Sequence, residues 1–145
     1  MRMTRPLALL LAATVLPSLA HSAPRLLTQT VPAAGLTRVT VSAGVGEVEV
    51  RAASGDEVRA EVVLEPRRGG LFSSIRAAER EVQEAVLTVS TADGELTLEV
   101  STDSGDRRFE ERWTLTLPAS LALELRVGVG NVRLDGLAGG VTLES

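Results

Sequence analysis

Carboxylates are the only side chains of this sequence that could carry acid-base catalysis. The chain has no cysteine and no lysine, and its single histidine, His21, lies close to the amino terminus. Ser-His-Asp and Cys-His nucleophile systems are therefore excluded, and so is a Walker loop, which needs its lysine. Glu110 and Glu111 are neighbours that would point to opposite faces of a strand, so they cannot flank one glycosidic bond. We expect no catalytic residue, and a carboxylate-dependent hydrolase is the alternative.

Two other groups of residues have types that suit a ligand. Asp103 and Asp106 could offer oxygen atoms to Ca²⁺, but an EF-hand needs more ligands at alternate positions, so a polar turn is the favoured interpretation. Trp113 and Phe109 could stack on a sugar ring, but they share strand parity with Leu115, which favours a place in the core. We expect no metal site and no cofactor site.

A glycine-rich unit occurs twice, 84 residues apart. Its copies are Gly44-Val45-Gly46-Glu47-Val48-Glu49-Val50 and Gly128-Val129-Gly130-Asn131-Val132-Arg133-Leu134. A dinucleotide fingerprint is excluded, because its third glycine would fall at Glu49 and Arg133. Glycine reaches the positive φ of a tight reversal, and apolar residues at every second position face one side of a strand. We predict two equivalent turns, each followed by a short strand, in a stack of strands rather than around an enzyme pocket.

The first 23 residues have the pattern of a signal peptide. A basic region is followed by an apolar core at residues 7–16 and by the small residues Ser18, Ala20 and Ala23. The apolar core is too short for a spanning helix, which needs about 20 residues. We predict an exported protein, in the periplasm or outside the cell at its surface, with no stable membrane anchor after cleavage. An uncleaved amino-terminal anchor is the alternative.

The charge balance argues against nucleic acid as a partner. The chain has 15 basic and 19 acidic residues, and loss of Arg2 and Arg5 with the signal peptide would bring the net charge to about −6. Binding to phosphates requires a basic excess on some face. The absence of cysteine also excludes disulfides, thiolate metal sites and lipid attachment through a cysteine.

Alternation of apolar and polar residues predicts strands over most of residues 37–145, which we expect to form one β-rich domain. Residues 24–36 are rich in proline and glycine and are expected to be an exposed lead-in. Ala92-Asp93-Gly94 predicts a hairpin turn. Apolar residues at helical spacing predict one short amphipathic helix at about residues 71–85, where Ser73 or Ser74 could cap its start.

The segments 39–64 and 115–143 resemble the bacterial putative-adhesin family of unknown function. The likeness rests on residues 115–125, Leu-Thr-Leu-Pro-Ala-Ser-Leu-Ala-Leu-Glu-Leu, and on residues 128–137, Gly-Val-Gly-Asn-Val-Arg-Leu-Asp-Gly-Leu. The resemblance implies an exported, β-solenoid-like stack of short strands. The family's name implies attachment to a surface, and it supplies no catalytic or ligand residue.

These observations together predict an all-β fold, either a solenoid-like stack or twisted antiparallel sheets, with one short helix. Val141 and Leu143 begin a fresh strand at the carboxy end, so either the helix or a partner covers the edge there, or the domain is part of a longer array. The edge of that strand would self-associate, pair with another envelope protein or continue into a further coil. We expect a non-enzymatic binding, adhesion or envelope-structural module.

Overall fold

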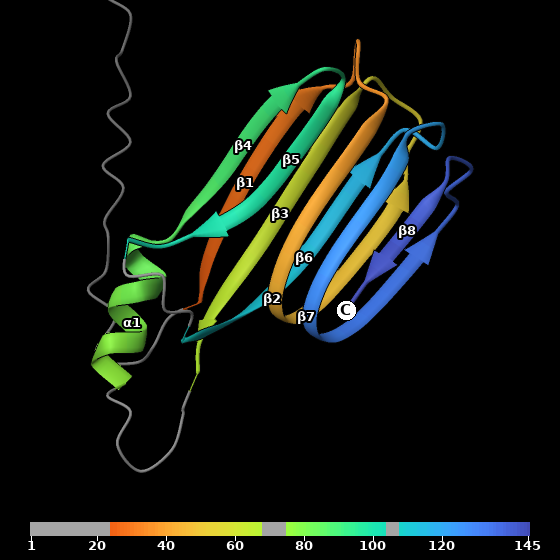
Figure 1. The fold of residues 1–145 in the computed structure, drawn as a ribbon. Coiled ribbons are helices and arrows are strands. Elements are labelled where there is room, and N and C mark those ends of the chain that lie inside the picture. Colours follow the sequence, from red (N-terminus) through yellow and green to blue (C-terminus); the bar gives the residue numbers. More distant parts are fainter. Residues whose placement is uncertain (1–23, 68–74, 104–107) are drawn as a thin grey trace, which may run out of the picture.

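A computed structural model describes residues 24–67, 75–103 and 108–145 of the chain (Figure 1). In these ranges most residues lie in strands, which form one sheet rolled into a nearly closed barrel. The elements, in chain order, are β1 (Arg25–Pro32), β2 (Arg38–Ala52), β3 (Glu57–Pro66), α1 (Ile75–Glu84), β4 (Val86–Ala92), β5 (Glu95–Ser101), β6 (Phe109–Leu117), β7 (Ala122–Asp135) and β8 (Val141–Glu144). The predicted β-rich fold with one short helix is confirmed.

Strand β2 is the centre of the sheet. On one side it pairs in parallel first with β5 and then with β6, and on the other side it pairs in parallel with β7. Antiparallel pairs extend the sheet from β6 through β3 to β1, and from β5 to β4, while β8 lies parallel to β7. The sheet is therefore mixed, which corrects the expectation of antiparallel sheets, and the predicted solenoid-like stack is not confirmed.

Figure 1 shows β2 and β7 each turning back on itself, so that the two halves of each strand lie in opposite walls of the barrel. We call the first wall the side formed by β4, β5, β8 and the first halves of β2 and β7. The second wall holds β1, β3, β6 and the second halves of β2 and β7. The long connections between parallel strands allow this arrangement, since parallel pairs need a crossover.

The glycine units form the bends between the walls. In β2 the odd residues Val39 and Val41 are buried before the bend, and the even residues Val48 and Val50 are buried after it. In a straight strand these two sets would face opposite sides of the sheet. Both sets reach the core because the alternation shifts by one residue at the glycines, where the backbone is irregular and Gly46 has a φ of 146°. The predicted turns are thus bends inside continuous strands, which corrects the expected separation of each turn from its strand.

The two repeated units are equivalent in space, as predicted. They lie side by side in parallel register, with Gly46 beside Gly130 and Val48 beside Val132. Gly46 has a φ of 146° and Gly130 a φ of 150°, a region that residues with a side chain rarely occupy. A Cβ atom on Gly46 would overlap the backbone carbonyl of Glu111. Only glycine therefore allows the strands to approach so closely at the bend.

Residues 24–36 are more ordered than the sequence suggested. Strand β1 occupies most of this segment and pairs antiparallel with β3 along its whole length. Its alternating partly buried positions include Leu27 and Val31, which pack against the core. The expected lead-in is therefore a paired strand, although most of its side chains are exposed as expected, because backbone pairing to β3 needs no strong apolar pattern in β1.

The predicted helix and hairpin are both present. Helix α1 begins at Ile75, and the first residues of the predicted helix, with Ser73 and Ser74, lie outside the described residues. The guanidinium of Arg25 donates to the carbonyl oxygens of Val82 and Ala85, both at 2.9 Å, at the carboxy end of α1. These bonds satisfy carbonyls that have no partner within a helix, so Arg25 ties β1 to α1.

The turn between β4 and β5 has the predicted hairpin chemistry. Asp93 has a φ of 50° and Gly94 a φ of 77°, and a two-residue turn with positive φ at both positions suits the twist of paired strands.

In the part of the chain that the structure describes, no helix is long and apolar enough to cross a membrane.

Candidate functional site

The bend of β2 holds a buried carboxylate, Glu111, for which the sequence pattern predicted no role. Glu111 on β6 is 1% exposed. Its Oε2 atom accepts a hydrogen bond from the backbone N–H of Gly44 at 2.7 Å, and its Oε1 atom accepts one from the indole of Trp113 at 3.2 Å. A buried carboxylate needs such donors to offset the loss of water. Glu111 therefore fixes the bend of β2 and orients Trp113, and this is a structural role.

The placement of the other predicted residues follows strand parity. Glu110 is exposed while Glu111 is buried, so the two carboxylates point to opposite faces as predicted. Trp113 and Phe109 are 0% and 1% exposed, which confirms that they belong to the core and removes the sugar-stacking alternative. Asp103 is exposed, and Asp106 lies outside the described residues. Among the described residues, no group of three or more histidine, aspartate or glutamate side chains could hold a metal ion.

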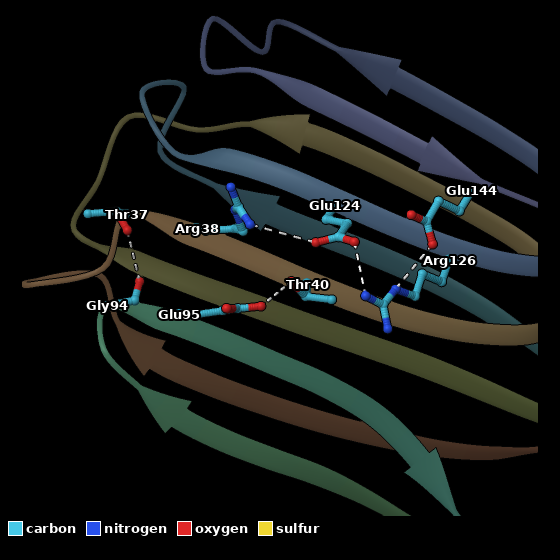
Figure 2. A network of polar contacts seen from close by, with 8 residues as sticks. All are labelled: Thr37, Arg38, Thr40, Gly94, Glu95, Glu124, Arg126 and Glu144. Carbon is cyan, nitrogen blue, oxygen red and sulfur yellow. Dashed lines mark hydrogen bonds and ion pairs between the residues drawn. The ribbon is translucent and has the colours of Figure 1, made fainter.

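The outer surface of the first wall carries a row of polar side chains that form two neighbouring groups of contacts (Figure 2). Arg126 lies between two carboxylates, with its Nη2 atom 3.1 Å from Glu124 and its Nε atom 3.4 Å from Glu144. Glu124 also lies 3.9 Å from the guanidinium of Arg38. Next to it, the hydroxyl of Thr40 is 2.8 Å from a carboxylate oxygen of Glu95 on β5. The row thus links β5, β2, β7 and β8 across the strands.

Parallel register explains why this row forms. Thr40 on β2 lies beside Glu124 on β7, and Arg126 lies beside Glu144 on β8. Neighbouring residues on adjacent strands share a face, so opposite charges placed there attract each other. The hydrogen bond from Arg126 to Glu124, and then the charges of Glu124 and Glu144, raise the pKa of Arg126 above its ordinary value. The row links neighbouring strands, and within it Glu124 forms ion pairs with both Arg38 and Arg126.

The outer surface of the second wall has a shallow pocket of about 320 Å³. Its polar lining comes from the outward positions of both repeated units and from β6. These residues are Glu47, Glu49, Arg112, Thr114, Asn131 and Arg133. In register, Glu47 lies between Arg112 and Asn131, and Glu49 lies between Thr114 and Arg133. We call this the unit pocket, because the variable positions of both glycine units line it.

The unit pocket presents groups of both charges and neutral hydrogen-bonding groups. The carboxylate of Glu47 lies 3.7 Å from Arg112, and Glu49 forms an ion pair with Arg51. Each of these arginine side chains is about 61% exposed, so water screens the pairs. Within the described ranges, Arg133 forms no ion pair and keeps its guanidinium available. Such a surface can bind a polar ligand by several weak contacts, and it holds no activated nucleophile.

The repeated glycine units contain a signal from which the unit pocket could be predicted. If the two glycine units pair in register, the residues between their valines must lie side by side on one face. Glu47 and Glu49 then meet Asn131 and Arg133, as the structure shows. The burial of Glu111 could also be predicted, because Glu111 has the same strand parity as Phe109 and Trp113. A charged residue at such an inward position needs hydrogen-bond partners inside the protein.

The fold is similar to the folds of solved proteins that are described as putative adhesins or binding proteins. A putative cell adhesion protein from Clostridium sporogenes matches with a TM-score of 0.54 and 13% sequence identity, over 83% of this chain and 57% of that protein. A putative adhesin from Bacteroides fragilis matches with a TM-score of 0.44 and 14% identity, over 84% of this chain and 53% of that one. A putative lipid binding protein from Parabacteroides distasonis has a TM-score of 0.42 and 13% identity, with coverages of 77% and 40%.

These similarities concern the fold. The chain spans 57% of the length of the Clostridium sporogenes protein, and the identity is low. No protein-family model matches the chain, and no curated protein sequence matches it. The resemblance to putative adhesins that the sequence suggested is thus confirmed for the architecture.

Proposed function

We propose that the chain is an exported, non-enzymatic module that binds or adheres at the bacterial envelope and does so through the unit pocket. The observation that carries this proposal is the alignment of the two repeated units, which places the outward residues of both in one shallow polar surface. A fold shared with a putative cell adhesion protein supports the same class of function. The signal-peptide pattern of residues 1–23 supports export.

The geometry of the unit pocket favours binding over catalysis. Glu47 and Glu49 are neighbours of arginines on an open surface, where each carboxylate forms an ion pair. A hydrolase would need convergent carboxylates in an enclosed cleft. The hydrolase alternative therefore gains no support from the described residues.

Adhesion by the unit pocket can be tested with beads that carry the purified chain. Coated beads should be retained on intact bacterial cells or on purified envelope, and retention should fall when Arg112 is replaced by serine. Arg59→Ser is the matched control, since Arg59 on the same wall also forms an ion pair, with Glu61, and is 59% exposed against 61% for Arg112. Equal retention of the three proteins, or retention no higher than on uncoated beads, would reject the proposal.

Two further measurements complete the test. A reporter active only outside the cytoplasm, fused behind residues 1–36, should become active, and an inactive reporter would reject export. Purified chain should also fail to hydrolyse general ester, peptide and glycoside substrates. Hydrolysis that disappears in Glu49→Gln would replace the binding proposal with the hydrolase alternative.

A further inference from the structure

The end of the barrel at β7 and β8 exposes side chains that face the interior. We call this the open end and define it by Val132, Leu134, Val141 and Leu143. Val141 and Leu143 lie beside Leu123 and Leu125, which are 2% and 0% exposed. Residues paired across strands point to the same face, so Val141 and Leu143 point inward as well, yet they are 42% and 54% exposed.

The second wall is equally uncovered at this end. Val132 and Leu134 lie beside Val48 and Val50 of β2, which are buried. Leu134 is nevertheless 39% exposed, because the second half of β7 has β2 on one side and no described strand on the other. A hollow of about 340 Å³ at this end is lined in part by Val127, Val132 and Leu143.

The open end has a step. Strand β8 pairs with residues 123–126, in the first half of β7, so the first wall extends one strand further than the second wall. The opposite end of the barrel has no such step, since β1 contacts β4 there and α1 packs against β3 and β6. A copy of the chain therefore cannot fit its open end onto the closed end of another, and only two open ends match each other.

We propose that two copies of the chain join at their open ends around a two-fold axis parallel to the strands. Such an axis keeps the direction of each strand and exchanges the two walls. Strand β8 runs parallel to the first half of β7, and the second half of β7 runs back the other way. The β8 strand of one copy thus lies antiparallel to the second half of β7 in the other copy, and each extra strand fills the partner's step.

The side chains agree with this pairing. Counted outward from the peptide bond between Gly128 and Val129, Leu125, the β7 neighbour of Leu143, is level with Val132, and Leu123, the neighbour of Val141, is level with Leu134. In the dimer, Leu143 and Val141 of one copy would contact Val132 and Leu134 of the other inside a continuous core. On the outer face, Glu144 would lie diagonally opposite the second copy's Arg133, within reach of an ion pair. A second copy therefore supplies both the apolar cover and the complementary charge.

Sedimentation equilibrium of the purified chain tests the dimer. We expect a reversible dimer, and Leu143→Arg should raise its dissociation constant by about tenfold or more, because the interface would bury an unpaired charge. Val86→Arg is the control, since Val86 on β4 is 58% exposed at the closed end. A parent chain that stays monomeric up to about millimolar concentration, assembly beyond a dimer, or equal weakening by both substitutions would overturn the proposal.

Cross-linking then tests the register. The chain has no cysteine, so Leu143→Cys and Val132→Cys each introduce a single thiol. Mixed and oxidised together, the two variants should give a disulfide-linked heterodimer, because adjacent antiparallel strands bring paired Cβ atoms within bonding range. Rapid cross-linking of Leu143→Cys alone would place the two β8 strands side by side and overturn this arrangement. So would a mixture that forms no heterodimer.

Discussion

The two glycine units have nearly the same sequence and backbone but different surroundings. Both bend between the walls at a glycine of positive φ, and their residues match one for one in parallel register. Val48 and Val50 in the first unit are 1% and 0% exposed, whereas the equivalent Leu134 in the second is 39% exposed. The local sequence determines the bend, and the neighbouring strands determine how much of each unit is buried.

A buried carboxylate, that of Glu111, supports the bend of the first unit, and no such carboxylate is described at the bend of the second. At the bend of β2, Glu111 accepts the N–H of Gly44 and the indole of Trp113. The bend of β7 packs instead on the backbone of the first unit, with Gly128 against Gly44 and Gly130 against Gly46. The unit in β7 therefore packs on the unit in β2. Substitutions in the first unit should lower the free energy of unfolding more than equivalent substitutions in the second.

The largest difference is expected at the bend glycines. Gly46→Val should lower the free energy of unfolding by about 4 kcal/mol, because it combines backbone strain with overlap on the backbone of Glu111. Gly130→Val combines similar strain with overlap on the backbone of Gly46, but it should cost only about 2 kcal/mol, since β7 has a free side toward which it can shift. Denaturant unfolding followed by Trp113 fluorescence measures both values.

A glycine without either constraint provides the control for this pair. Gly55 has open space around its Cβ position and no positive φ, so Gly55→Val should change stability by less than about 0.5 kcal/mol. If Gly46→Val and Gly130→Val cost the same, β7 is held as firmly as β2 and the comparison fails.

Removal of the buried carboxylate should have the next largest effect. Glu111→Ala leaves two buried donors, the N–H of Gly44 and the indole N–H of Trp113, without their partner. We expect a loss of about 3 kcal/mol and a change in the near-ultraviolet circular dichroism of Trp113. Glu110→Ala, at the exposed neighbouring position, should stay within about 0.5 kcal/mol. Equal losses at the two positions would show that Glu111 does not support the bend.

The same substitution in the two units tests burial directly. Val48→Ala removes two methyl groups from a fully buried site and should cost about 2 kcal/mol. Val132→Ala is the equivalent change in β7, where the side chain is half-buried, and it should cost less than about 1 kcal/mol. Urea denaturation of both variants measures the two losses of unfolding free energy and so their ratio. A larger loss for Val132→Ala in dilute monomer would contradict the exposed position of the second unit.

The smallest effect is expected in the polar row of the first wall. Arg126→Gln removes the ion pairs to Glu124 and Glu144, and the loss of stability should be smaller than for Val132→Ala and should vanish in high salt. The raised pKa of Arg126 means that its contribution is fully present below the ordinary pKa of arginine and is lost only as pH rises through the still higher folded value. The difference between parent and variant should therefore stay constant from pH 7 to about 10. A difference that shrinks over this range would contradict the assignment.

Much of the local structure could be predicted from the sequence. The alternation of Val58, Ala60, Val62 and Leu64 predicts β3 and its buried face, and Asp93-Gly94 predicts the β4–β5 turn. Trp113 was predicted to be buried from its parity with Leu115. These predictions hold because period-two patterns and positive-φ turns depend on a few consecutive residues.

Pairing between distant segments was not predictable in the same way. Strand β1 has no clear apolar pattern, and its place depends on the backbone groups that β3 offers. The unit pocket depends on a register that joins residues 84 positions apart. Local patterns do not specify such a register, because many alternative pairings satisfy the same alternation.

The sequence by itself determined where the chain bends and which residues of each strand alternate, since glycine at positive φ and period-two apolar residues act locally. The tertiary structure alone decided that the two units lie side by side, that Glu111 is buried at their bend, and that Leu134 and Leu143 remain exposed. The physical reason is that burial belongs to the contacts between strands. Two units with the same glycine and apolar pattern differ in burial once one lies at the centre of the sheet and the other near its edge.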